Sequence, residues 1–124
     1  MRLTPMVLLP PREWLFNRCD ARFEAMLASG GKDEVAALLN RGLNPDLPVM
    51  RAIGVREIAA MLADPADSAR SIAKAKIATR QYAKRQFTWF RNQPPADWFR
   101  INAQLDNDKI DDLAIKLQHM ALTD

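Results

Sequence analysis

The sequence has too little cysteine, histidine and glycine for several common kinds of functional site. Cys19 and His119 are each the only residue of their type among 124, which excludes an intrachain disulfide and a zinc site built from Cys and His. The four glycines form no phosphate-binding loop followed by Lys and Ser or Thr. No apolar run approaches the roughly 18 residues of a membrane-spanning helix, so we expect a cytoplasmic chain with no membrane partner.

Acidic residues are missing from one long segment, which therefore holds the positive excess of the chain. No acid occurs from Ser68 to Ala96, whereas the rest of the sequence is acidic on balance and the formal net charge is +3. The basic residues of this segment are Arg70, Lys74, Lys76, Arg80, Lys84, Arg85 and Arg91. The segment indicates a polyanionic partner; a solvated helix surface and a membrane-surface helix are the alternatives.

Helical geometry sorts this segment into two faces. At about 100° per residue, the basic residues occupy roughly half of the circumference. The apolar residues opposite them are Ile72, Ala75, Ala78, Tyr82, Trp89 and Phe90. We expect the apolar face to pack on a core, and Trp98 also to be a core residue. Gln81, Gln86 and Thr88 are able to bond phosphates or base edges.

Periodicity predicts a mainly α-helical chain of about five helices, one of them long and basic, with one or two short strands. The expected helices are residues 11–27, 32–41, 49–62, 68–93 and 107–120, and the expected strands are Met6–Leu9 and Trp98–Ile101. The apolar content of 48% suffices for one small domain but not for two. Gly30 is expected to end the first helix in a left-handed conformation.

Two further clusters hold candidate functional residues. Arg18 and Arg22 are four residues apart, so both guanidinium groups leave one helix face and are able to grip a diphosphate. A surface pair beside acidic neighbours is the alternative. Gly54, between Arg51 and Arg56, weakens the predicted helix unless another backbone or a ligand approaches closely; close helix packing is the alternative there.

Four runs of residues resemble the C-terminal part of bacterial tRNA dimethylallyltransferases. They are RCDARFEAML at 18–27, EVAAL at 34–38, DLPVMRAIGVRE at 46–57 and ATRQYAKRQFTWFR at 78–91. Their order and spacing agree with the family, the last run is the most specific, and the likeness covers about residues 7–92. The resemblance implies a single C-terminal fragment over 1–124, with a family-like helical region at 6–92 and a tail helix within 93–124. Its strands would complete the α/β phosphate-loop-type core of the full-length family.

The same resemblance implies a function and its residues. The family transfers a dimethylallyl group from dimethylallyl diphosphate to N6 of the adenosine 3′ of the tRNA anticodon, with the base flipped out. Arg22 matches the arginine that contacts the diphosphate and is the expected catalytic residue, with Arg18 as a second diphosphate contact. The residues expected to contact the tRNA anticodon stem-loop are Arg51, Gly54, Arg56, Arg80, Gln81, Lys84, Arg85, Gln86 and Arg91. Mg²⁺ is implied for the full-length family, and no metal ligand is expected in this chain.

The family pattern also begins with a phosphate-binding loop and a general-base Asp that these 124 residues do not contain. We therefore expect a chain that lacks the N-terminal half of the family fold and is inactive alone. Two other functions remain open: a non-catalytic RNA-binding helical module, and a helical scaffold whose basic face docks an acidic protein. An unpaired strand edge and exposed apolar surface would favour self-association.

Overall fold

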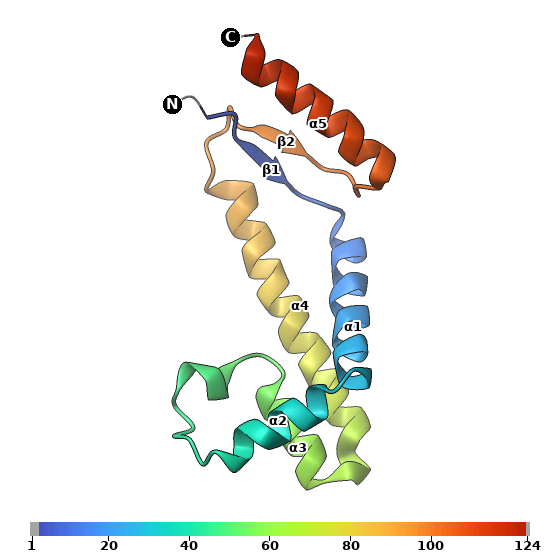
Figure 1. Ribbon diagram of the computed structural model, residues 1–124, viewed down its shortest axis with the longest axis vertical. Helices are drawn as coiled ribbons and strands as arrows, with labels where there is room; N and C mark the ends of the chain where they lie inside the picture. Colours follow the sequence, from blue (N-terminus) through green and yellow to red (C-terminus); the bar gives the residue numbers. More distant parts are fainter. Residues whose placement is uncertain (1–2, 124) are drawn as a thin grey trace. The chain divides into compact units, whose positions relative to one another are not determined.

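The computed structural model describes residues 3–123, which form five α-helices, two short 3-10 helices and two strands (Figure 1). The strands are β1 (Met6–Leu8) and β2 (Phe99–Ile101). The α-helices are α1 (Arg12–Ala28), α2 (Gly31–Asn40), α3 (Val55–Ala63), α4 (Ser68–Asn92) and α5 (Asn107–Leu122), and the 3-10 helices are η1 (Pro48–Arg51) and η2 (Pro65–Asp67). The predicted fold class is confirmed. No described helix has the length and apolar character that crossing a bilayer requires.

The contacts within the chain define two compact units. The first, here called the helical unit, is Phe16–Lys84; the second, here called the strand unit, combines Met1–Leu15 with Arg85–Asp124. The boundaries between the units fall inside α1 and α4. The division of the chain at residue 93, which came from the family resemblance, stays a prediction.

Four helices each contribute one residue to the core of the helical unit. Phe23 from α1, Val35 from α2, Ile58 from α3 and Ala75 from α4 are buried together. The partly buried residues packed against them are Leu27, Val55, Ala59 and Ile72. Because Ala75 is fully buried and small, the other helices approach the backbone of α4 closely at that point.

Gly54 corrects the helix predicted at 49–62. The residues before it form only the short 3-10 helix η1, and α3 begins at Val55. Gly54 has φ of 98°, a conformation that residues with a Cβ rarely adopt. Its N–H donates to Oε2 of Glu57 at 3.1 Å, which satisfies one backbone donor that has no partner within the helix at the start of α3. The glycine therefore shapes the turn before a helix and does not interrupt one.

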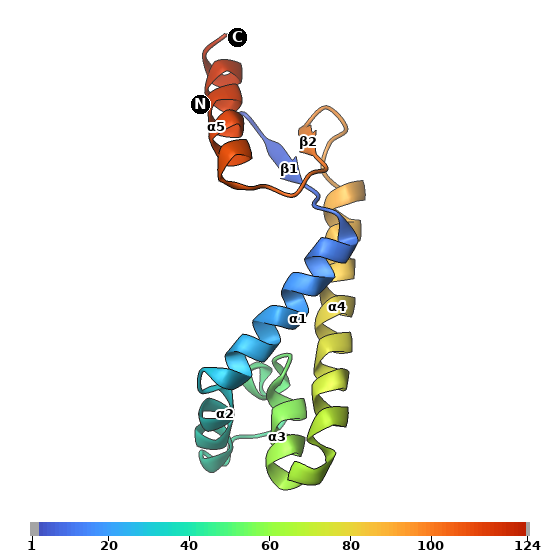
Figure 2. The same cartoon turned by 90° about the vertical axis from the view of Figure 1, so that its right-hand side faces the viewer.

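The strand unit contains a parallel pair in which Met6, Val7 and Leu8 lie opposite Phe99, Arg100 and Ile101 (Figure 2). The guanidinium of Arg100 fixes the chain before β2 by donating to the carbonyl oxygens of Pro94, Pro95, Ala96 and Trp98 at 2.9–3.1 Å. At the start of α5, Asp106 accepts the N–H of Lys109 at 2.9 Å. Lys116 of α5 lies over the ring of Phe99, 4.3 Å from its centroid, so α5 contacts β2 at this point.

The predicted apolar face of α4 is confirmed only in part. Ala75 lies in the core and Ile72 packs against it, whereas the aromatic residues Tyr82, Trp89 and Phe90 do not lie in a core. Tyr82, Trp89 and Phe90 are 47%, 56% and 46% exposed, and Trp98 is also exposed. The buried residues of α4 are Ser71, Ala75 and Ala83. An apolar stripe is buried only where another element covers it, and within each unit the neighbouring elements leave these four rings uncovered.

Candidate anion-binding site

Three segments of the helical unit line a cavity of about 240 Å³ that is open to solvent. Its walls are Cys19, Arg22, Phe23 and Met26 from α1, Ile53 from the turn before α3, and Thr79 and Tyr82 from α4. Arg22 is the only charged residue among these, and most of the others are apolar. A cavity with one guanidinium in an apolar wall suits a small ligand that has an anionic head and an apolar body.

Turn and helix geometry place these side chains around the cavity. Met26 lies three residues after Phe23 and four after Arg22 on α1, so its side chain is on the same side of the helix as both of them. Gly54 allows the sharp turn that brings the neighbouring Ile53 to the opposite wall. The hydroxyl of Thr79 donates to the carbonyl oxygen of Ala75 at 2.8 Å, which holds the polar atom of Thr79 against its own helix.

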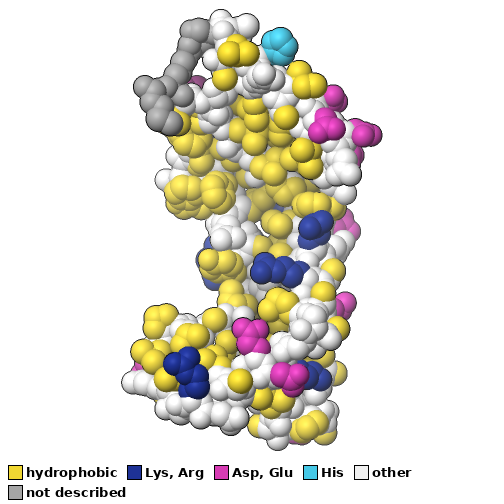
Figure 3. Space-filling view, in the orientation of Figure 1, with side chains coloured by type: hydrophobic (Ala, Val, Ile, Leu, Met, Phe, Trp, Pro, Cys, Tyr) yellow, Lys and Arg dark blue, Asp and Glu magenta, His cyan; other side chains and the backbone are white. Residues whose placement is uncertain are grey.

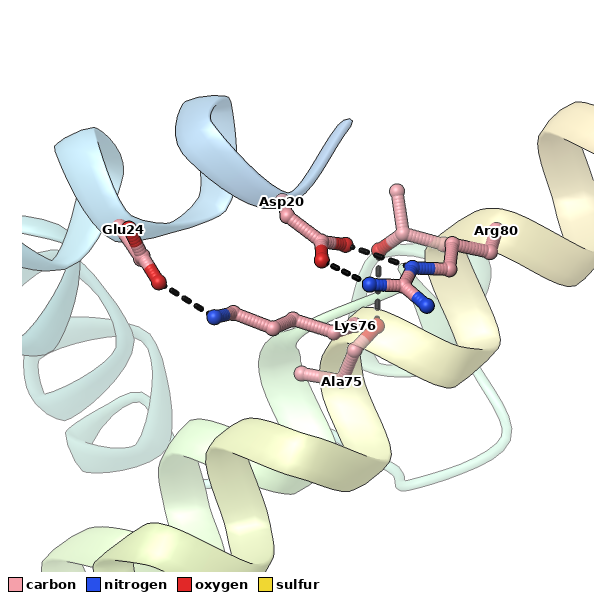
Figure 4. A network of polar contacts seen from close by, with 6 residues as sticks. Asp20, Glu24, Ala75, Lys76 and Arg80 are labelled. Carbon is pink, nitrogen blue, oxygen red and sulfur yellow. Dashed lines mark hydrogen bonds and ion pairs between the residues drawn. The ribbon is translucent and has the colours of Figure 1, made fainter. Parts of the chain in front are cut away.

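The structure separates Arg18 from Arg22. Arg22 lines the cavity, whereas Arg18 is not among the lining residues. The diphosphate contacts of Arg22 and of Arg18 both stay predictions. The acidic residues near this pair, Asp20 and Glu24, turn instead toward cations of α4 (Figure 4).

Two ion pairs join α1 to α4 within the helical unit (Figure 4). Arg80 donates from Nε to Oδ1 of Asp20 at 2.9 Å and from its second guanidinium nitrogen to Oδ2, so the pair is bidentate. Lys76 donates to Oε1 of Glu24. Hydrogen bonding from Arg80 lowers the pKa of Asp20 below its usual value, and the same contact raises the pKa of Arg80.

These ion pairs change how the basic face of α4 is interpreted. Lys76 and Arg80 have their charge compensated by α1, although the Arg80 side chain remains 44% exposed. The other basic residues of this helix are all exposed: Arg70, Lys74, Lys84, Arg85 and Arg91. On the face shown in Figure 3, Lys and Arg side chains form separate groups and no continuous patch. The contact of Arg80 with tRNA stays a prediction.

The remaining predicted tRNA contacts lie on different elements. Arg51 is exposed on η1, Gly54 is buried, and Arg56 is exposed in the first turn of α3. Gln81 and Gln86 are exposed on α4. Arg56 lines a second cavity of about 240 Å³ with Glu57, Ala60, Asp67, Ser71 and Lys74. The structure therefore brings Arg56 close to one cation of α4, Lys74, which the sequence did not predict.

Sequence reasoning missed the residues that complete the cavity around Arg22. Met26, Ile53 and Tyr82 were treated as ordinary apolar residues or were not singled out, and Asp20 was treated as a local neighbour of the arginines. The contacts of Asp20 with Arg80 and of Glu24 with Lys76 join residues 60 and 52 positions apart. Only the matching i, i+4 spacing of the two acids and the two cations could have suggested these pairs.

Within residues 3–123, no group of three or more His, Cys, Asp or Glu side chains is placed to hold a metal ion. The Mg²⁺ that the family resemblance implies therefore finds no set of protein ligands among these residues, and no chemical step is assigned to it.

The sequence profile of the family described as IPP transferase matches residues 1–93, three quarters of the chain. The chain belongs to the IPP transferase family. A tRNA dimethylallyltransferase of Sphingopyxis alaskensis is 61% identical over 121 residues, which cover 98% of this chain and 40% of that protein. The corresponding protein of Zymomonas mobilis is 51% identical over 117 residues, covering 94% and 38%. The chain thus spans about 40% of the length of these relatives.

Solved structures of the family share the fold. The tRNA isopentenylpyrophosphate transferase of Bacillus halodurans superposes with a TM-score of 0.74 at 31% identity, covering 96% of this chain and 40% of that one. The tRNA delta(2)-isopentenylpyrophosphate transferase of Staphylococcus epidermidis gives a TM-score of 0.75 at 27% identity, covering 94% and 38%. The arrangement of helices and strands in this chain is therefore that of the corresponding portion of the IPP transferase family.

Proposed function

We propose that this chain forms the tRNA-binding and diphosphate-contacting portion of a tRNA dimethylallyltransferase. Such an enzyme transfers a dimethylallyl group from its diphosphate to N6 of the adenosine 3′ of the anticodon. Relatives that match nearly the whole chain carry this name. A cytoplasmic location is part of the same proposal, because tRNA is the substrate.

The cavity around Arg22 is the observation that supports this function best. Dimethylallyl diphosphate combines a multiply charged anionic head with a short branched hydrocarbon, and the cavity combines one guanidinium with Phe23, Met26, Ile53 and Tyr82. The guanidinium of Arg22 would offset the negative charge that grows on the departing diphosphate. The apolar walls would hold the hydrocarbon and limit the access of water to it.

Exposed cations support the RNA-binding part of the proposal. Lys84 in the helical unit and Arg85 and Arg91 in the strand unit all reach solvent. Contacts of this kind with phosphates set affinity and make it dependent on salt. Gln81 and Gln86, exposed beside them on the same helix, have the donors and acceptors that base edges require.

Replacing Arg22 tests the diphosphate contact. We expect Arg22→Gln to weaken binding of dimethylallyl diphosphate to the full chain about tenfold or more, because one charge-assisted hydrogen bond is worth roughly 1.5–3 kcal/mol. Calorimetric titration measures this change. Arg41→Gln removes an equal charge from an exposed position outside the cavity and is the matched control. Equal affinities of the Arg22→Gln and Arg41→Gln variants would contradict the assignment.

Replacing Lys84 and Arg85 by Gln tests the RNA contact. Affinity for an anticodon stem-loop should fall, and the slope of log affinity against log salt should become shallower by about one for each lost phosphate contact. Lys32→Gln with Arg41→Gln removes the same charge elsewhere. Equal binding of the stem-loop and of an unrelated polyanion such as heparin would instead favour the acidic-partner scaffold.

The inactivity of the isolated 124 residues stays a prediction, and a turnover assay tests it. The assay contains the chain, dimethylallyl diphosphate, Mg²⁺ and a tRNA with adenosine 3′ of the anticodon. RNA binding without turnover is the result we expect, and it would equally describe a non-catalytic RNA-binding module. Prenylated adenosine formed at the rate of a longer family member would refute the prediction.

A further inference from the structure

The strand unit has a cavity of its own, of about 550 Å³, at the carboxyl ends of its two parallel strands. Leu9 directly follows β1 and Asn102 directly follows β2, and both line the cavity. In sheets of parallel strands, ligands bind in the crevice outside the carboxyl ends. The cavity therefore occupies a position that such folds use for binding.

Three arginines line this cavity and no carboxylate does. They are Arg12 from the first turn of α1, Arg91 from the last turn of α4, and Arg100 from β2. Three like charges around one open space repel one another, and an anion between them would remove that repulsion. Arg12 also stands at the N-terminal end of a helix, where a cation is unfavourable unless negative charge lies near it.

The three arginines are held differently. The guanidinium of Arg100 already donates hydrogen bonds to carbonyl oxygens of the segment 94–98. It therefore adds positive charge to the cavity but is not counted among the donors to a ligand. Arg12 lies over the ring of Phe87, 5.1 Å from its centroid, which orients the guanidinium without neutralising it. Arg91 is exposed. Arg12 and Arg91 thus remain able to donate to a ligand, with the side-chain amide of Asn102 as a third donor.

We propose that this cavity binds a phosphate group through Arg12, Arg91 and Asn102. Planar guanidinium forks match the oxygens of a phosphate in pairs, and an uncharged or cationic ligand would leave the charge of the cavity uncompensated. The phosphate comes either from an RNA backbone or from a small phosphate compound. The site lies in a different compact unit from the Arg22 cavity. Because Arg91 is also a proposed tRNA contact, the RNA source of the phosphate rests on the proposed function, whereas the small-compound source does not.

Titration of the full chain with inorganic phosphate tests the site. The shifts of the backbone amides of Arg12, Glu13 and Asn102 are followed by ¹H–¹⁵N NMR while sodium chloride keeps the ionic strength constant. We expect saturable changes at these amides, and Arg91→Gln should weaken binding about tenfold, since a hydrogen bond to a charged group contributes roughly 1.5–3 kcal/mol. Arg70→Gln removes one exposed charge of α4 outside the cavity and should leave affinity unchanged.

A second variant distinguishes loss of phosphate binding from loss of folding. Arg12→Lys keeps the charge but loses the fork, so it should bind phosphate more weakly than the wild type and melt at nearly the same temperature. Changes at the amides that do not saturate, or equal weakening by Arg91→Gln and Arg70→Gln, would overturn the proposal. An unchanged affinity in Arg91→Gln with an intact melting transition would overturn it as well.

Competition identifies the source of the phosphate. If inorganic phosphate displaces an anticodon stem-loop from the wild type but not from Arg91→Gln, the site is occupied by the RNA backbone. If the stem-loop stays bound while the amide shifts saturate, the site takes a small phosphate compound. Either result supports the site. Loss of dimethylallyl diphosphate binding in Arg22→Gln with intact phosphate shifts would show that the two sites are separate.

Discussion

The two units differ in how far each buries its own apolar residues. In the helical unit, α1, α2, α3 and α4 meet around a shared core that includes Ile58, which is only 2% exposed. In the strand unit, the buried residues are Val7 and Leu9 beside a two-stranded sheet. Among the described residues, each unit exposes eight large apolar side chains, so the difference lies in what is buried; those of the strand unit are Leu3, Leu8, Trp89, Phe90, Trp98, Ile110, Ile115 and Leu122. Figure 3 shows hydrophobic side chains gathered over β1, β2 and α5.

The difference follows from the secondary structure of each unit. The backbone groups of a helix form hydrogen bonds within the helix itself. A few helices can therefore form a core when each packs one apolar stripe against the others. Parallel strands are normally covered on both faces, and a two-stranded sheet is marginal by itself. In the described part of the strand unit, α5 makes one contact of this kind with the sheet: Lys116 lies over the ring of Phe99 in β2.

The candidate sites differ in the same way. The cavity of the helical unit has one guanidinium in an apolar wall, whereas the cavity of the strand unit has three arginines around the ends of the strands. The first suits a ligand with a hydrocarbon part, and the second suits a bare phosphate. Under these two proposals, the helical unit would provide apolar selectivity and the strand unit would provide positive charge.

Removing a core side chain should have the largest effect on the free energy of unfolding, and it tests directly whether the helical unit is packed more tightly than the strand unit. Ile58→Ala is expected to lower the free energy of unfolding by about 2–5 kcal/mol, because it removes buried methyl groups and leaves a cavity among the helices. Chemical denaturation followed by circular dichroism measures the change. Ile115→Ala in α5, where the side chain is 56% exposed, should cost less than about 0.5 kcal/mol. Equal losses would mean that the strand unit is as tightly packed as the helical one.

A substitution that strains the turn before α3 should have an intermediate effect on stability. Gly54→Ala is expected to cost about 1–2 kcal/mol, because a Cβ is unfavourable at positive φ. Crowding is not the cause, since the added Cβ would lie 3.5 Å from Cε2 of Phe23, an ordinary contact. Gly30→Ala, at a φ of 106° with open space around it, should lose a similar amount. Thermal melting of both variants checks this, and an undiminished stability of Gly54→Ala would contradict the positive φ.

Local chemistry made the ends of several helices predictable. Gly30 ends α1, prolines follow α4, and an aspartate begins α5, and each acts within a few residues of the boundary. One or two short strands were also expected at nearly the observed positions, but their parallel pairing was not predicted. The start of the third helix was missed because periodicity continued through Gly54, and its positive φ is set by the packing of the turn and by its bond to Glu57.

Contacts between distant residues were not predictable in the same way. The amphipathic pattern of α4 identified which face could be buried, but burial at Tyr82, Trp89 and Phe90 also requires a covering element. The face with Lys76 and Arg80 was expected to meet solvent, and instead it meets Glu24 and Asp20 of α1. A sequence shows the charges on each helix, and only the fold shows which of them compensate one another.

Breaking the Asp20–Arg80 pair should have the smallest effect, and it tests whether that compensation stabilises the helical unit. Asp20→Asn is expected to cost at most about 1 kcal/mol, because the partly exposed Arg80 is screened by water. Asp97→Asn, an exposed aspartate of the strand unit, is the matched control. The exchange Asp20→Arg with Arg80→Asp should recover part of the loss, because it restores the opposite charges across α1 and α4.

The pH dependence of this pair distinguishes an ion pair from ordinary packing. The pKa of Asp20 is lowered in the folded chain by the hydrogen bond from Arg80, so its contribution is present above the unfolded pKa of about 3.9. That contribution disappears as the pH falls through the lower folded pKa. The stability difference between wild type and Asp20→Asn should therefore be constant near neutral pH and shrink below about pH 4. A difference that stays constant down to pH 2 would show that Asp20 acts through packing and not through its charge.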